Sequence, residues 1–123
     1  MVSFTGTIPR EKSQEFVQSI LFRPDHYLPL TFRPTRAQPG DYLYLIYRGK
    51  LIARVQIAGT KNVQAFKATR TDLPPDWAKW LIMYRGSWEI PPDEILVEGH
   101  QGIRYLDGSY LSNLDKQSWN PIK

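Results

Sequence analysis

The chain has 123 residues, of which 41% are hydrophobic and 23% charged, so we expect a single domain over residues 1–123 with a core of its own. It contains no cysteine, which excludes a disulfide framework and a thiolate metal site and fits a cytoplasmic location. No apolar run approaches the roughly 20 residues that span a bilayer. We therefore expect no membrane partner, and the N-terminus has no pattern typical of a secretory signal.

The formal net charge of +4 conceals an asymmetry along the chain. Residues 1–70 carry 11 basic and 4 acidic side chains, a balance of +7, whereas residues 71–123 carry 5 basic and 8 acidic, a balance of −3. A basic segment attracts phosphate-rich partners, so this pattern favours contact with a nucleic acid. The alternative is a solvated surface that only keeps the protein in solution.

The N-terminal third predicts a strand, a helix and an extended segment, in that order. Residues 2–8 form a short strand that ends at Pro9. A helix is expected from about Arg10 to Phe22, because Phe16, Val17, Ile20 and Leu21 fall on one apolar stripe. The segment 25–32 is expected to be extended, since prolines disfavour helical geometry in the residues before them.

Residues 39–59 predict a β-hairpin at the centre of the chain. In its first strand Tyr42, Tyr44 and Ile46 point to one face, and residues 43, 45 and 47 point to the other. Both sets are apolar or aromatic, so we expect both faces of this strand to be covered, as in a barrel wall. The turn at residues 48–50 uses Gly49 for a positive φ and carries Arg48 and Lys50 at its tip.

The C-terminal half predicts short elements. Residues 63–69 are ambiguous, with a slight preference for a strand, and Pro74-Pro75 indicates the start of a short helix containing Trp77 and Trp80. Short strands are expected near residues 81–84, 95–98 and 103–106, and Asp107-Gly108 predicts a tight hairpin turn. The expected fold is therefore mostly β with short helices (α+β), a small β-barrel.

The central hairpin resembles that of the PUA-like superfamily, which includes the ASCH and EVE domains. The matching features are the Gly40-Asp41 turn and the return strand from Gly49 to Val55, and the preceding segment 30–33 resembles the T-x-R element of ASCH domains. The resemblance covers residues 10–59. It implies a PUA-like barrel with a cleft that binds RNA, or DNA and RNA carrying modified bases.

The same resemblance implies roles for individual residues. Gly40 and Asp41 would be structural, whereas Thr31 and Arg33 would face the cleft. The hydrolytic ASCH proteins have a lysine shortly before the T-x-R element, and residues 26–30 contain none. This departure favours binding over hydrolysis.

Aromatic residues next to arginines suggest how a nucleic acid would be held. Rings can stack on bases while guanidinium groups contact phosphates, although the same pairs can also be core rings with arginines at the rim. Trp88 follows the loop-like Arg85-Gly86-Ser87 and is expected to be an exposed ring. We expect RNA rather than DNA as the partner, with no cofactor and no metal. The predicted contacts are Tyr27, Thr31, Arg33, Arg36, Arg48, Lys50, Tyr84, Arg85, Trp88 and Arg104.

Two alternatives remain open. The first is a small nuclease or modified-nucleoside hydrolase, with His26 and His100 as acid and base, or with a glutamate (89, 94 or 98) transferring the proton. The second is a protein-interaction module, in which the acidic half and exposed tryptophans meet a protein partner.

Overall fold

The computed structural model describes residues 4–22, 27–30, 38–67, 74–92, 94–96, 103–105 and 118–122. Within them the strands form one mixed, seven-stranded sheet in the order β2-β5-β4-β3-β1-β6, with β7 pairing to β5 outside this path. The prediction of a mostly β fold with short helices is confirmed. The elements are β1 (Phe4–Ile8), α1 (Gln14–Leu21), β2 (Tyr27–Leu30), β3 (Tyr42–Tyr47), β4 (Lys50–Asn62), α2 (Val63–Lys67), β5 (Trp80–Ile90), β6 (Ile103–Tyr105) and β7 (Asn120–Pro121).

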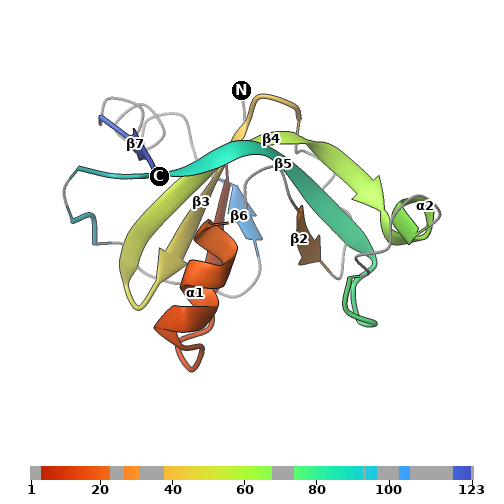
Figure 1. Ribbon diagram of the computed structural model, residues 1–123, viewed down its shortest axis with the longest axis horizontal. Helices are drawn as coiled ribbons and strands as arrows, with labels where there is room; N and C mark the ends of the chain where they lie inside the picture. Colours follow the sequence, from red (N-terminus) through yellow and green to blue (C-terminus); the bar gives the residue numbers. More distant parts are fainter. Residues whose placement is uncertain are drawn as a thin grey trace.

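The sheet curls into a half-barrel, with β4 and β5 arching over α1 and β2 (Figure 1). β1 pairs with β3 in parallel, and the other paired strands run antiparallel. The pairing of β4 shifts register against β3 near Ile46 and against β5 near Gln56 and Gly59. Such irregularities bend a strand and increase its twist, which gives the sheet a concave and a convex face.

The central hairpin has the predicted geometry. Its turn contains Gly49 at φ 78° and Arg48 at φ 50°. Leu43 and Leu45 of β3 belong to one buried cluster and Tyr44 and Ile46 to another, so the prediction that both faces of this strand are covered is confirmed. Gly40 lies at φ 96°, which supports the structural role expected for the Gly40-Asp41 turn.

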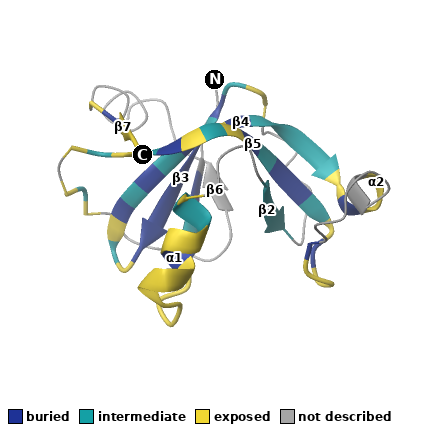
Figure 2. Ribbon diagram, in the orientation of Figure 1, coloured by how far each residue is buried: buried dark blue, intermediate teal, exposed yellow. Residues whose placement is uncertain are grey.

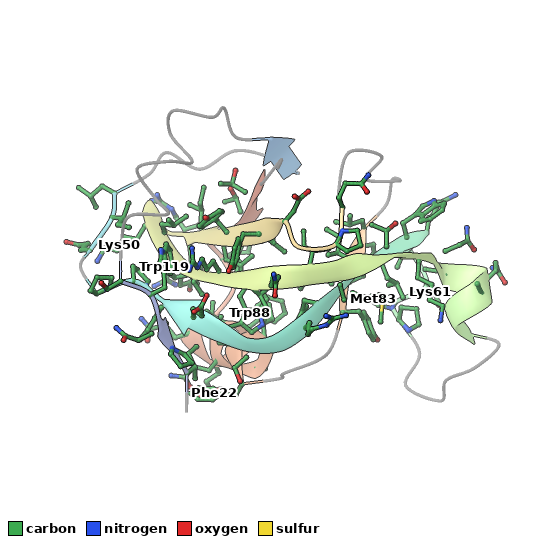
Figure 3. All side chains as sticks on the ribbon, turned by 90° about the horizontal axis from the view of Figure 1, so that it is seen from above. Phe22, Lys50, Lys61, Met83, Trp88 and Trp119 are labelled. Carbon is green, nitrogen blue, oxygen red and sulfur yellow. The ribbon has the colours of Figure 1, made fainter. Side chains whose placement is uncertain are left out.

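The larger buried cluster lies on the concave face, where α1 covers the sheet (Figures 1 and 2). Its strand residues include Leu43, Val55 and Ile82, and α1 contributes Val17. The cluster that contains Tyr44 lies on the convex face, where Trp119 of the C-terminal segment, labelled in Figure 3, covers Tyr44. The C-terminal segment is therefore part of the wall of the half-barrel.

α1 begins at Gln14 rather than at Arg10, which corrects the expected helix start. Residues 9–12 form a turn in which the Lys12 amide donates to the Pro9 carbonyl at 3.1 Å. Ser13 caps the helix, since its side-chain oxygen accepts a hydrogen bond from the Phe16 amide at 3.2 Å. The cap and the preceding proline together place the first turn later than the apolar stripe indicated.

The C-terminal half departs from prediction in several places. Residues 63–67 are helical, not extended, and residues 76–77 form a turn instead of a helix, so that Trp80 already begins β5. β5 continues through the segment expected to be a loop at residues 85–87. Of the strand expected at 95–98, the described residues show a single bridge between Leu96 and Lys50. The predicted turn at residues 107–108 lies outside the described residues.

In the part of the chain that the structure describes, neither helix has the length and apolar character needed to span a membrane.

Candidate functional site: an aromatic cavity on the concave face

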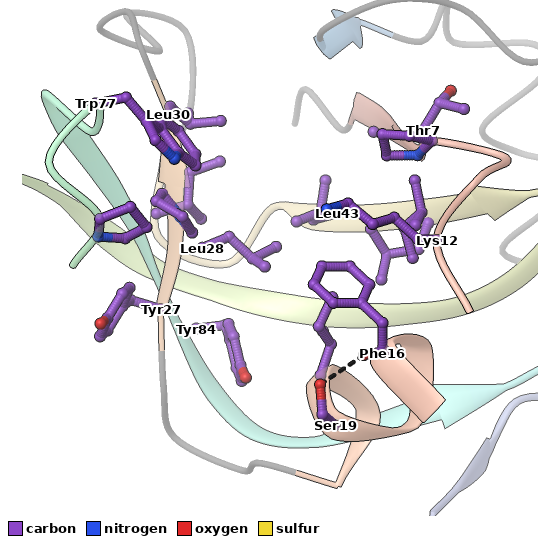
Figure 4. A pocket seen from close by; sticks show the side chains of 18 residues that line it. Thr7, Lys12, Phe16, Ser19, Tyr27, Leu28, Leu30, Leu43, Trp77 and Tyr84 are labelled. Atoms are coloured by element: carbon purple, nitrogen blue, oxygen red, sulfur yellow. Dashed lines mark hydrogen bonds between the residues drawn. The ribbon is translucent and has the colours of Figure 1, made fainter. Parts of the chain in front are cut away.

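A cavity of about 740 Å³ opens on the concave face, between α1 on one side and β2 on the other (Figure 4). Its described lining includes the rings of Phe16, Tyr27, Trp77 and Tyr84. Aliphatic side chains from four strands complete the walls, including Ile8, Leu28, Leu30, Leu43, Leu45 and Ile82. A volume of this size lies within the roughly 300–1,000 Å³ of typical small-molecule sites.

The rings of Tyr27, Trp77 and Tyr84 reach the cavity from β2, β5 and the turn before β5. Tyr27 pairs with Met83 across the β2–β5 ladder and packs with it against a third buried cluster, whereas Tyr84, the next residue of β5, projects from the opposite face into the concave core. The turn that carries Trp77 is closed by a 3.0 Å hydrogen bond from the Ala78 amide to the Pro75 carbonyl. Beyond this turn the Lys79 amide donates to the Leu30 carbonyl at 2.8 Å. Trp77 is therefore held beside β2, close to Leu30 in Figure 4.

The opposite wall is made by α1 and the turn before it. Phe16 and Ile20 are four residues apart and face the cavity together, as the helical repeat requires. The Lys12 ammonium lies over the Phe16 ring, 5.0 Å from its centroid. Phe16 is 40% and Trp77 54% exposed, so a ring from each wall stands partly in solvent. The cavity thus has an aliphatic interior with partly exposed rings and a cation among its lining residues.

Two predicted contact residues, Tyr27 and Tyr84, line this cavity, but Trp88 does not. The expectation that Trp88 is exposed is wrong, because its side chain is completely buried in the concave core. Between the pairs Gln56–Arg85 and Arg54–Glu89, β5 has more residues than β4, and Gly86 takes φ 76° within this bulge. This bulge leaves the alternation of β5 unchanged, so Trp88 shares the concave face with Tyr84 and packs edge-on against it, with ring centroids 5.1 Å apart.

The hairpin cations do not line the cavity. Arg48 and Lys50 are exposed, and the Arg48 guanidinium lies 4.9 Å from the centroid of the Tyr47 ring. Lys50 forms a 2.6 Å ion pair with Glu94, and both side chains are more than half exposed. The structure therefore separates these two cations from Tyr27 and Tyr84, whereas the sequence predicts all four in one cleft.

Arg54 is a structural cation on the convex face. Its guanidinium lies 4.2 Å from the Tyr42 ring centroid and 4.7 Å from that of Trp119, and its Nε donates to Glu89 Oε1 at 2.9 Å. Burial alone lowers the pKa of Arg54, but hydrogen bonds with Tyr44 and Glu89 and their charges outweigh burial and raise that pKa. The segment around Arg54 contributes to the basic excess without offering this group to a partner.

The remaining predicted contacts are placed as follows. Arg85 is exposed on β5, next to Tyr84 in sequence, and does not line the cavity. Arg104 lies in β6, paired through its backbone with Thr5. Its side chain lies outside what the structure describes, as do Thr31, Arg33 and Arg36 altogether.

The groups considered for catalysis are not assembled at the cavity within the described residues. Glu89 is paired with Arg54 and Glu94 with Lys50, and neither lines the cavity. His26, Glu98 and His100 lie outside the described residues. Over the same described ranges, no group of three or more histidine, aspartate or glutamate side chains could hold a metal ion.

Three lining residues, Lys12, Phe16 and Trp77, are not among the contacts predicted from the sequence. Phe16 belongs to the predicted apolar stripe of the helix, and Trp77 to a predicted helix that is a turn in the structure. The stripe is wide enough to indicate two contact faces, because Phe16 and Ile20 each precede Val17 and Leu21 by one position. In the structure the first pair lines the large cavity and the second pair lines a smaller hollow. Lys12 had no signal, because only the turn at residues 9–12 brings it over Phe16.

The chain matches no protein-family model, and comparison with curated proteins and with solved structures found no match either.

Proposed function

We propose that this chain is a nucleic-acid-binding domain of PUA-like type that takes an unpaired base into the cavity on its concave face. The observation that carries the proposal is the set of rings around one cavity, Phe16, Tyr27, Trp77 and Tyr84. Stacking of a base on an aromatic side chain contributes about 1–3 kcal/mol and does not depend on the identity of the base. Two of these rings, Phe16 and Trp77, are partly exposed and accessible to a ligand in solution.

The charge of the chain supports the same proposal. Its net charge is +4, and Lys12 places a cation among the residues that line the cavity. In our proposal Lys12 contacts a phosphate next to the inserted base. Arg48 and Lys50 do not line the cavity, so in our proposal they contact nucleotides that flank the inserted base. RNA is the favoured partner, since unpaired bases in RNA loops are commonly recognised by stacking on aromatic rings. We place this activity in the cytoplasm, which the absence of cysteine suits.

The PUA-like assignment is part of the proposal. It is supported by the curled, mostly β sheet and by the Gly40-Asp41 turn that precedes β3. In that turn the buried Asp41 accepts a 3.0 Å hydrogen bond from the Gln38 amide, and the Ile57 amide donates to the Asp41 carbonyl at 2.8 Å. The turn thus ties the start of β3 to β4, as expected for a structural motif.

The test is a fluorescence-anisotropy titration with short, labelled single-stranded RNA and DNA at two salt concentrations. The logarithm of the affinity should fall linearly with the logarithm of the salt concentration. Trp77→Ala should weaken binding by roughly 5- to 150-fold, the equivalent of the stacking energy of one base. Phe22→Ala is the matched control, because Phe22 is 59% exposed and does not line the cavity.

Absence of binding at low salt would refute the proposal, and so would equal losses in the Trp77 and Phe22 variants. Preferential binding of DNA would correct the expected partner and leave the site in place.

A further inference from the structure

The turn before α1 is bonded to the central hairpin. The Tyr47 hydroxyl, at the end of β3, donates a hydrogen bond to the backbone carbonyl of Lys12. Tyr47 is 6% exposed, Lys12 is exposed, and the bond between them is partly buried. The Lys12 amide is used as well, since it donates to the Pro9 carbonyl at 3.1 Å. Both backbone polar groups of Lys12 are therefore held, one by its own turn and one by the hairpin.

α1 stands between the hairpin and the cavity. Val17 and Leu21 face a small hollow of about 230 Å³ that is also lined by Tyr47 and Ile52. Phe16 and Ile20, each one position earlier and so about 100° around the helix, face the large cavity. A change at the hairpin can thus reach the cavity through the helix and the turn that precedes it.

The fixed turn determines where the Lys12 side chain begins. Its ammonium lies over Phe16, 5.0 Å from the ring centroid, and Lys12 and Phe16 both line the cavity (Figure 4). A lysine side chain is long and flexible, so a cation that is already held near its binding position loses less entropy when a ligand arrives.

We infer that Tyr47 is a positioning residue of the cavity, whose hydroxyl holds the 9–12 turn so that Lys12 stands over Phe16. What Lys12 is positioned to meet, a phosphate, rests on the proposed function. The hairpin then contributes to binding through a core hydroxyl, in addition to any contact made by the cations at its tip.

The first measurement needs no ligand. In the free protein the Phe16 ring current should shift the Lys12 ε-methylene NMR signals upfield, and Tyr47→Phe should move them toward their position in Phe16→Leu. Arg48→Gln is the matched control, because it alters the group over the Tyr47 ring without touching the hydroxyl. Unshifted Lys12 signals in the unmodified protein would overturn the inference, and so would signals that stay in place in a folded Tyr47→Phe variant.

The second measurement is a double-mutant cycle on binding to single-stranded RNA. Lys12→Gln should reduce the salt slope by about one. Tyr47→Phe should weaken binding about two- to tenfold, the range expected for one hydrogen bond. Adding it to Lys12→Gln should cause little further loss, whereas a purely structural role would give additive losses. Additivity therefore overturns the positioning role. If the protein binds no RNA but the Lys12 signals respond to Tyr47→Phe, the proposed function fails and the positioning of Lys12 by Tyr47 holds.

Discussion

Replacing Trp88 by phenylalanine should change the free energy of unfolding by less than about 1 kcal/mol, although Trp88 is completely buried. The reason is the indole nitrogen, which lies in the concave core without a hydrogen-bond partner among the residues that the structure describes. A buried donor without a partner costs about 1–3 kcal/mol. Phenylalanine removes this donor and keeps most of the ring.

The opposing cost follows from the smaller ring. Besides the nitrogen, phenylalanine lacks about two carbon groups of the indole, and burying each such group contributes about 0.8 kcal/mol. Together with the void that the smaller ring leaves, the lost stability is roughly 2 kcal/mol. The two effects nearly cancel. Trp88→Ala has no such balance, because it also removes the edge-on contact with Tyr84 at 5.1 Å. We expect it to cost at least about 3 kcal/mol.

The assay is urea denaturation followed by circular dichroism for both Trp88 variants. Trp119→Phe is the matched control, because Trp119 is also largely buried, at 9% exposed. Among the described residues, the buried side-chain atoms that lack a partner do not include its indole nitrogen. The control should lose roughly 2 kcal/mol, since it gains nothing from the removal of a donor. The reasoning is refuted if Trp88→Phe destabilises the protein as much as Trp88→Ala does.

Three further predictions concern a cap, a turn and an ion pair. Ser13→Ala removes the cap of α1 and should cost about 1 kcal/mol in thermal unfolding; an unchanged midpoint would show that the cap contributes nothing. Gly49→Ala forces a side chain into φ 78° and should cost roughly 1–2 kcal/mol by the same assay, whereas Gly6→Ala, which has no positive φ and only ordinary contacts, should be near neutral. Glu89→Gln should lower the free energy of unfolding in urea by about 1–2 kcal/mol, a value reduced because Glu89 is 28% exposed. Glu94 is more exposed, so Glu94→Gln should lower it by less than about 0.5 kcal/mol, and equal losses would contradict the assigned environments.

Local chemistry was sufficient to predict the central hairpin. Alternating side chains, Gly49 and the turn at Gly40 act over a few residues, so their consequences can be derived without knowing what packs against them. The same holds for the extended segment at Tyr27–Leu30, which prolines keep out of the helical region. Ring chemistry alone predicts Tyr27 and Tyr84 as base contacts; both line the cavity, and their contact with a base stays a prediction.

The position of each ring and cation relative to the cavity depended on contacts between distant segments. β5 continues as a strand through residues 85–87, where the sequence predicts a loop, and Trp88 therefore lies on the concave face with Tyr84. The turn before α1, bonded to Tyr47, brought Lys12 over Phe16, while Arg54 was enclosed by Tyr42 and Trp119. A sequence specifies which groups are available, but strand register and packing across the sheet decide which face each group occupies, because a register shift of one residue moves a side chain to the other face.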